Sequence, residues 1–202
     1  VWTAGNVSER VVVDRGNGPV KTDLFVIKPS GVSYDDLSPE AMVVCDLDGN
    51  LVLGEGSPSS DTAAHAYVYR HMSEVGGVVH THSTYATAWA ARGEEIPCVL
   101  TMMGDEFGGS VPVGPFALIG DDSIGRGIVD TLRESRSPAV LMRNHGPFTI
   151  GRDARAAVKA AVMVEEVAKT VHVARAGGPL VPIEQHHIDS LYDRYQNVYG
   201  QH

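Results

Sequence analysis

The chain has 202 residues, and its 16 Lys and Arg residues against 25 Asp and Glu residues give a formal net charge of −9. This acidic balance argues against a nucleic-acid or anionic-membrane surface, although it leaves room for a local pocket that binds a small anion. The length favours one domain over residues 1–202. The two cysteines, Cys45 and Cys98, form no disulfide framework and favour a reduced, cytoplasmic protein, and no apolar run approaches the ~18–20 residues of a membrane helix.

Strand and helix patterns alternate along the chain. Short apolar, β-branched runs bounded by turn residues predict strands, and segments that open on a Ser or Asp cap predict helices. In chain order we expect strands over 10–14, 24–28, 42–46 and 51–53, a helix over 59–75, a strand over 77–82, a helix over 84–91, a strand over 97–101, a helix over 121–134, strands over 139–143 and 147–151, and a helix over 152–176. This order predicts an α/β fold, a three-layer αβα sandwich with a central, mainly antiparallel sheet.

Three of the nine histidines stand at the ends of apolar runs. His80 and His82 are two residues apart in a predicted strand, so both imidazoles would point to one face of the sheet, as metal ligands do. His145 ends a second apolar run before a Gly-Pro turn, a suitable position for a third ligand. The alternative is that His80 and His82 are polar residues on a solvated face. Other histidines are interpreted as ordinary helix or surface residues: His65, His71, His186, His187 and His202.

Two short segments have the composition of an anion site. Lys28-Pro29-Ser30-Gly31 follows a predicted strand and offers an ammonium, a hydroxyl and a backbone amide. Ser59-Ser60 precedes a predicted helix, whose free N–H groups favour negative charge. A surface turn and an ordinary helix cap are the simpler explanations, but together with a metal site the segments indicate a phosphorylated substrate. Asp61, in the first turn of that helix, either stabilises the helix dipole or places a carboxylate between phosphate and metal.

Four motifs, in order and with matching spacing, resemble the class II aldolase/epimerase superfamily. They are Lys28-Pro29-Ser30-Gly31-Val32, Pro58-Ser59-Ser60-Asp61-Thr62, Gly76-Gly77-Val78-Val79-His80-Thr81-His82-Ser83 and Asn144-His145-Gly146-Pro147-Phe148. The resemblance runs from residue 5 to residue 201. Members of the superfamily normally begin with a helix before this stretch, whereas this sequence opens on Val1-Trp2-Thr3 without Met, so we expect an N-terminal helix to precede it in the complete protein.

The resemblance implies a homotetramer with active sites between adjacent subunits. It also implies one divalent metal ion per subunit, usually Zn²⁺, with Mn²⁺ or Co²⁺ as alternatives. The implied metal ligands are His80, His82, His145 and Asp61, and the implied phosphate-binding residues are Asn6, Lys28, Ser30, Gly31, Ser59 and Ser60. Asp105 and Tyr199 match the superfamily's two acid/base residues, the tyrosine being contributed by a neighbouring subunit. Met103 stands where many members have His.

Asp61 favours the epimerase branch, because aldolases of the superfamily carry Glu there for proton transfer, whereas epimerases carry Asp, similar to a fourth metal ligand. The expected reaction is the C4 epimerisation of a ketopentose phosphate, L-ribulose 5-phosphate to D-xylulose 5-phosphate. Since the C4 hydrogen is not acidic, the favoured route is C3–C4 cleavage to a metal-stabilised enediolate and glycolaldehyde phosphate, followed by re-formation of the bond. Two alternatives stay open: an aldolase of the fuculose-phosphate type, and a non-enzymatic, adducin-like binding domain.

Overall fold

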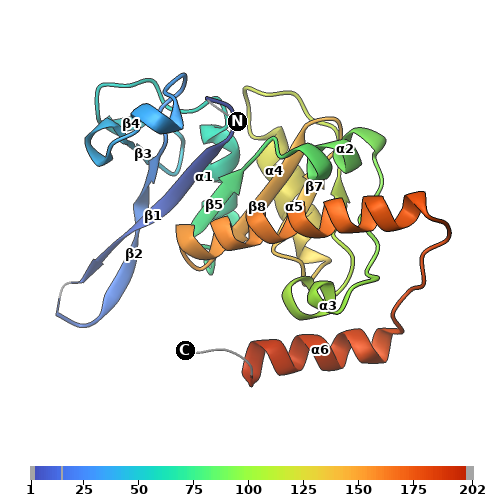
Figure 1. Ribbon diagram of the computed structural model, residues 1–202. Helices are drawn as coiled ribbons and strands as arrows, with labels where there is room; N and C mark the ends of the chain where they lie inside the picture. Colours follow the sequence, from blue (N-terminus) through green and yellow to red (C-terminus); the bar gives the residue numbers. More distant parts are fainter. Residues whose placement is uncertain (1–2, 15, 199–202) are drawn as a thin grey trace.

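The computed structural model describes residues 3–14 and 16–198, so Tyr199 and the first two residues lie outside the described range (Figure 1). Its strands are β1 (Asn6–Asp14), β2 (Pro19–Ile27), β3 (Val43–Asp46), β4 (Leu51–Leu53), β5 (Gly77–His80), β6 (Val113–Gly114), β7 (Ala139–Met142) and β8 (Gly146–Gly151). Its α-helices are α1 (Thr62–His71), α2 (Thr84–Arg92), α3 (Thr101–Phe107), α4 (Ser123–Arg133), α5 (Ala154–Ala176) and α6 (Gln185–Asn197), and two 3₁₀ turns are η1 (Tyr34–Asp36) and η2 (Pro39–Ala41). None of the described helices is long and apolar enough to cross a membrane.

The strands form one sheet in the order β4-β3-β2-β1-β5-β8-β7-β6. Among the described strands every pairing is antiparallel, apart from that of β6 with β7. β1 and β5 lie in the middle, and their register places Asn6 opposite His80. On its other side β5 pairs with β8, where His80 lies opposite Phe148. Segments far apart in the sequence therefore meet at the end of β5.

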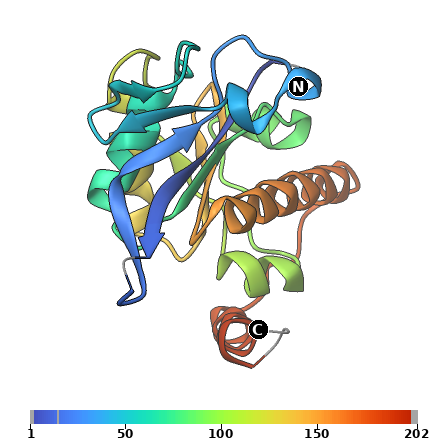
Figure 2. The ribbon, with the colours of Figure 1, turned by 90° about the vertical axis from the view of Figure 1, so that its left-hand side faces the viewer.

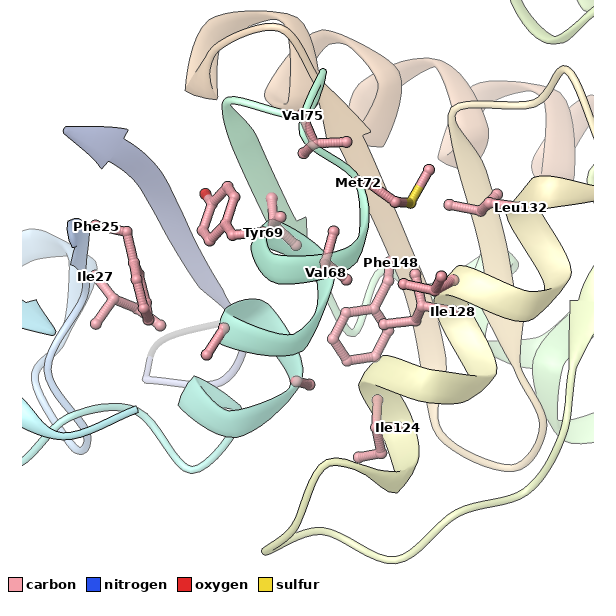
Figure 3. Close-up of a cluster of buried hydrophobic side chains, with 14 of the residues drawn as sticks. Phe25, Ile27, Val68, Tyr69, Met72, Val75, Ile124, Ile128, Leu132 and Phe148 are labelled. Atoms are coloured by element: carbon pink, nitrogen blue, oxygen red, sulfur yellow. The ribbon is translucent and has the colours of Figure 1, made fainter. Parts of the chain in front are cut away.

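Helices cover both faces of this sheet, as Figure 2 shows with α5 on one side and α1 and α4 on the other. Side-chain alternation in β5 explains the two layers, because Val78 faces α1 and α4 whereas Val79 packs against α5. The core under α1 and α4 includes the side chains in Figure 3: Phe25, Ile27, Val68, Tyr69, Met72, Val75, Ile124, Ile128, Leu132 and Phe148. This is the predicted αβα arrangement with a mainly antiparallel sheet.

The predicted strand over 97–101 is wrong. Ile96 pairs with Val111 in an isolated bridge, and Thr101 already begins α3. Pro97 has no N–H with which to extend a ladder; Cys98 is buried in a hydrophobic cluster instead, and Val99 and Leu100 are partly buried against it. α3 and α6 have no counterpart in the prediction, because α3 contains a glycine and α6 is largely polar. The predicted helix over 59–75 ends at His71.

Candidate functional site

Three imidazoles converge where β5 and β8 meet. His80 is the last residue of β5, His82 lies in the turn after it, and His145 directly precedes β8. Ligating nitrogen atoms of the three rings lie within 4.8 Å of one another, and Nε2 of His80 is 2.8 Å from Nε2 of His82. The strand was predicted to continue to His82, but it ends at His80, and the turn brings His82 to the same place.

The environment of His80 leaves one of its nitrogens free for a ligand. Its Nδ1 lies 3.0 Å from the carbonyl oxygen of Pro147. Because a carbonyl can only accept, Nδ1 carries the hydrogen, and the lone pair of Nε2 faces the other two rings. Burial, reinforced by His145, lowers the pKa of His80 to about 3, so the imidazole is neutral at physiological pH. Metal-binding histidines typically have such a carbonyl partner.

The turn before His145 depends on an unusual backbone conformation. Asn144 has φ of 58°, in the left-handed region that Asn adopts more readily than other non-glycine residues. Its N–H donates to the carbonyl of Ala90 at 3.0 Å, and the N–H of His145 donates to the carbonyl of Met142 at 3.0 Å. Two backbone hydrogen bonds thus hold the turn that places His145 over the end of β5.

A carboxylate from α1 lies beside this cluster. Asp61 occupies the N-cap position of α1, not the first turn, and its side chain does not cap the helix. Its Oδ2 instead accepts from Nδ2 of Asn6 at 2.7 Å, and the same amide donates to Oγ of Ser59 at 2.9 Å. Among the described residues, Oδ1 of Asp61 and Oδ1 of Asn6 are buried without a hydrogen-bond partner. Preceding Asn6, Gly5 has φ of 80°, and a Cβ there would lie 2.7 Å from the carbonyl oxygen of His80.

These donors suit a divalent metal ion. Three imidazoles and one carboxylate form a nitrogen and oxygen set that Zn²⁺ accepts in tetrahedral sites, and that Mn²⁺ and Co²⁺ also tolerate. An unpartnered, buried oxygen on Asp61 is what a ligand to a cation requires, since an orphaned buried acceptor is otherwise unfavourable. The residues present therefore fit the metal that the sequence motifs imply.

The two predicted anion segments come together in the structure. Pro29 and Pro58 form an isolated antiparallel bridge, and the N–H of Ser30 donates to the carbonyl of Ser57 at 2.9 Å. A pocket of about 250 Å³ opens between them. All six predicted phosphate-binding residues line it, and so do Asp61, His82 and His145: Asn6, Lys28, Ser30, Gly31, Ser59 and Ser60. Residues predicted to bind phosphate and residues predicted to bind metal thus line the same cavity.

Lys28 is the positive group of this pocket. Its side chain is almost fully buried, with 1 % of the residue exposed. Its Nζ donates to the carbonyls of Pro29 at 3.1 Å and Thr3 at 3.4 Å, and no carboxylate of the described residues forms an ion pair with it. Burial lowers the pKa of Lys28. A buried ammonium without a counter-charge favours the binding of an anion.

Of the two predicted acid/base residues, Asp105 is described by the structure and does not line this pocket. Asp105 lies on α3, at the opposite end of the molecule from the start of β1 in both Figure 1 and Figure 2. Its carboxylate accepts from Nη2 of Arg194 on α6 at 3.4 Å. Met103 is buried in the core nearby. Tyr199 lies outside the described residues.

Sequence reasoning missed two polar residues beneath the site. His65, interpreted as an ordinary helix residue, is fully buried, and its Nδ1 lies 2.7 Å from Oγ of Ser8. Spacing could have revealed this pair, because His65 is one turn after Asp61 and Ser8 is two residues after Asn6. No role was predicted for Glu165 on α5, yet its carboxylate accepts the N–H groups of Tyr85 and Ala86 at 3.0 and 2.9 Å. It therefore caps α2, the helix that follows His82.

Known proteins share this fold. A family model described as the Class II Aldolase and Adducin N-terminal domain matches residues 1–172. A solved L-fuculose 1-phosphate aldolase is 28 % identical, with a TM-score of 0.84 over 96 % of this chain and 87 % of that one. YgbL of Escherichia coli, a putative aldolase/epimerase/decarboxylase, is 25 % identical, with a TM-score of 0.78 over 95 % and 88 %. The l-fuculose-1-phosphate aldolase of Thermus thermophilus is 26 % identical, with a TM-score of 0.70 over 89 % of each chain. The chain thus belongs to the class II aldolase and adducin N-terminal domain family.

Proposed function

We propose that this protein is a metal-dependent enzyme that breaks and re-forms a carbon–carbon bond of a phosphorylated ketose. Within that chemistry we propose the C4 epimerisation of a ketopentose phosphate, with L-ribulose 5-phosphate as the first substrate to test. The observation that carries the proposal is the shared pocket. A buried, uncompensated Lys28 ammonium lines the same cavity as His82 and His145, two members of the histidine cluster. A substrate with a phosphate at one end and a reacting centre near a metal would require this arrangement.

Residues of this pocket would hold the two ends of the substrate. Lys28 supplies the positive charge for the phosphate, and Ser30, Ser59 and Ser60 supply hydroxyl donors around it. His80, His82, His145 and Asp61 would hold the metal ion, with Asn6 fixing one oxygen of the Asp61 carboxylate. When bound, the ion supplies Lewis-acid stabilisation of the negative charge that develops beside the C2 carbonyl.

Epimerisation at C4 requires two proton-transfer groups. One group takes the proton of the C4 hydroxyl as the C3–C4 electron pair moves into an enediolate, which releases glycolaldehyde phosphate. The aldehyde turns to its other face, the bond re-forms, and a group on the opposite side returns a proton to the C4 oxygen. The phosphate stays on Lys28 throughout, so that the aldehyde turns without leaving.

We assign these two roles to Asp105 and Tyr199. Because Asp105 lies on α3 and does not line the pocket of its own chain, the proposal assigns it to the pocket of another copy. The proposal therefore includes a homotetramer, with sites completed across subunit interfaces. Asp105→Asn and Tyr199→Phe would each abolish turnover. Mixed tetramers of a pocket variant, His82→Ala, with either acid/base variant would regain part of it, since some sites would then be intact.

Aldol cleavage is the second candidate. It is favoured by the similarity to two L-fuculose 1-phosphate aldolases, at 28 % and 26 % identity. Against it stands the short Asp61 side chain, whose Oδ2 is held by Asn6 and whose other oxygen has no partner among the described residues. A carboxylate fixed in this way suits a ligand better than a proton carrier.

The deciding experiment uses chelator-treated protein, assayed with and without added Zn²⁺ or Mn²⁺. Conversion of L-ribulose 5-phosphate is followed with a coupled assay for D-xylulose 5-phosphate, and cleavage is followed by aldehyde release from L-fuculose 1-phosphate. Metal-dependent epimerisation without net aldehyde release supports the proposal. Metal-dependent aldehyde release without epimerisation contradicts the epimerase proposal and supports the aldolase. A purified protein that neither binds metal nor turns over either sugar would favour the adducin-like binding domain.

A further inference from the structure

The Lys28 ammonium lies against an aromatic ring as well as against two carbonyls. Its Nζ is 5.1 Å from the centroid of the Tyr34 ring, within the range of a cation–π interaction. Of its two hydrogen bonds, the one to Thr3 is long at 3.4 Å and the one to Pro29 measures 3.1 Å. Both acceptors are neutral, so neither contact compensates the charge.

Burial and the ring act on Lys28 in opposite directions. Burial lowers the pKa of Lys28, which means that the site disfavours the charged form that phosphate recognition requires. The negative face of an aromatic ring favours that charged form without competing for the anion, because the ring carries no net negative charge. Burial also raises the pKa of the Tyr34 phenol, so the side chain stays neutral.

Tyr34 is placed so that its ring can do this without being part of the core. It begins η1, a short turn capped by Ser33, whose Oγ accepts from the N–H of Asp35 at 3.3 Å. Tyr34 also lines an apolar groove of about 490 Å³ with Val7, Val79 and other side chains. With 43 % of the residue exposed, substitutions at Tyr34 leave the packed interior intact.

We propose that Tyr34 is a positioning residue for the phosphate site, whose ring keeps the Lys28 ammonium charged and confined at the wall of the pocket. This inference rests on the proposed function, because it assigns Lys28 to an anionic substrate group. It adds that anion affinity depends on an aromatic ring at position 34 and not on the Tyr34 hydroxyl.

The test measures binding of inorganic phosphate to the Zn²⁺-loaded protein by titration calorimetry. Tyr34→Leu is expected to weaken binding about three- to tenfold, the range for a partly desolvated cation–π contact. Tyr34→Phe keeps the ring and is expected to stay within about twofold of the wild type. Tyr195→Leu is the matched control, since the Tyr195 ring lies 5.0 Å from Nζ of Lys159 and neither residue lines the pocket.

A double-mutant cycle separates this role from simple packing. In a Lys28→Met background, Tyr34→Leu is expected to cause no further loss of phosphate affinity, whereas a packing effect would persist. Zn²⁺ affinity is expected to be unchanged in every variant, and Tyr34→Met provides a second non-aromatic substitution should Tyr34→Leu unfold. Unchanged or tighter phosphate binding by Tyr34→Leu overturns the inference, as does a loss that persists without Lys28. If the wild type binds no phosphate, the proposed phosphate site itself is refuted, and the role of Tyr34 with it.

Discussion

Oγ of Ser8 lies 2.7 Å from Nδ1 of His65, and this contact joins the central strand β1 to helix α1 inside the core. The hydroxyl of Tyr69 lies 2.8 Å from the same Ser8 oxygen, so the buried side chains of His65, Ser8 and Tyr69 are linked by hydrogen bonds. Burial lowers the pKa of His65 to about 4, an effect that Asp61 opposes and His80 reinforces. Among the described residues, Nε2 of His65 has no hydrogen-bond partner. The folded protein therefore keeps this imidazole neutral.

This arrangement predicts acid sensitivity of the metal-free protein. Since the pKa of His65 in the folded protein is about 4, below the ordinary histidine value of 6.5, the unfolded state binds more protons between these pH values. The contribution of His65 is thus fully present above pH 6.5 and is lost as the pH falls towards 4, by up to about 3 kcal/mol. Denaturant unfolding at a series of pH values would measure the slope.

A substitution of His65 tests how much of this pH dependence of stability arises from that residue. His65→Asn, which keeps a polar atom near Ser8, is expected to be less stable than the wild type at pH 7.5 and to lose less stability on acidification. His80, with a pKa of about 3, titrates in the same direction, so part of the slope remains. His71→Asn alters an exposed histidine of the same helix and should keep the wild-type slope. An unchanged slope in His65→Asn would show that the acid sensitivity arises elsewhere.

Metal binding should depend on His82 and not on the exposed histidines of α6. His82→Ala removes one of the converging nitrogens, and we expect Zn²⁺ affinity to fall by more than about 100-fold, because loss of even an outer partner costs 10–100-fold. Chelator competition would measure it. The control is His187→Ala, which belongs to the exposed cluster of Glu184, His186 and His187. A larger loss in His187→Ala than in His82→Ala would place the metal at α6.

Asn144, which precedes His145, has a left-handed backbone conformation, and this leads to a prediction about stability. Asn144→Val should destabilise the protein by about 1–2 kcal/mol, because a β-branched residue is strained at φ of 58°. Asn144→Gly should cost less, since glycine adopts this conformation readily, although the 3.4 Å bond from Nδ2 to the carbonyl of Ala91 is lost. Thermal unfolding of the two variants compares them directly. Equal losses would mean that the side chain, and not φ, matters at this turn.

Glu165 and Glu166 form a matched pair for testing the cap of α2. Glu165→Gln weakens the two hydrogen bonds from the backbone N–H groups of Tyr85 and Ala86 and should cost about 1–2 kcal/mol. Glu166 is exposed, so Glu166→Gln should change the free energy of unfolding by less than about 0.5 kcal/mol. Urea titrations at one pH provide the measurement. Similar values for the two variants would contradict the capping role.

Features with a local signature could be predicted from the sequence. β-branched runs bounded by turn residues marked most of the strands, and His80 with His82 at the end of such a run marked the cluster. The six predicted phosphate-binding residues line one pocket. The bridge between Pro29 and Pro58 joins the two segments that carry five of them, and β1 contributes the sixth, Asn6.

Features set by packing between distant elements could not be predicted. α6 has few apolar residues, and its helical pattern depends on packing against α3, which the sequence does not display. The burial of Lys28 and the capping of α2 by Glu165 also arise from contacts between segments far apart in the chain. Likewise, the sequence shows that Asp61 and His65 are four residues apart. Their hydrogen bonds to Asn6 and Ser8 form only because β1 lies against α1.

The position of β5 between β1 and β8 sets the order in which a ribosome can complete the site. His80 lies opposite Asn6, made 74 residues earlier, and opposite Phe148, made 68 residues later. A nascent chain lacks His145 and the carbonyl partner of His80 until β8 has been synthesised. High metal affinity is therefore expected only after the last strand of the sheet has been made. Contacts of such sequence separation also make folding slow. Time-resolved zinc uptake during refolding would therefore lag behind helix formation.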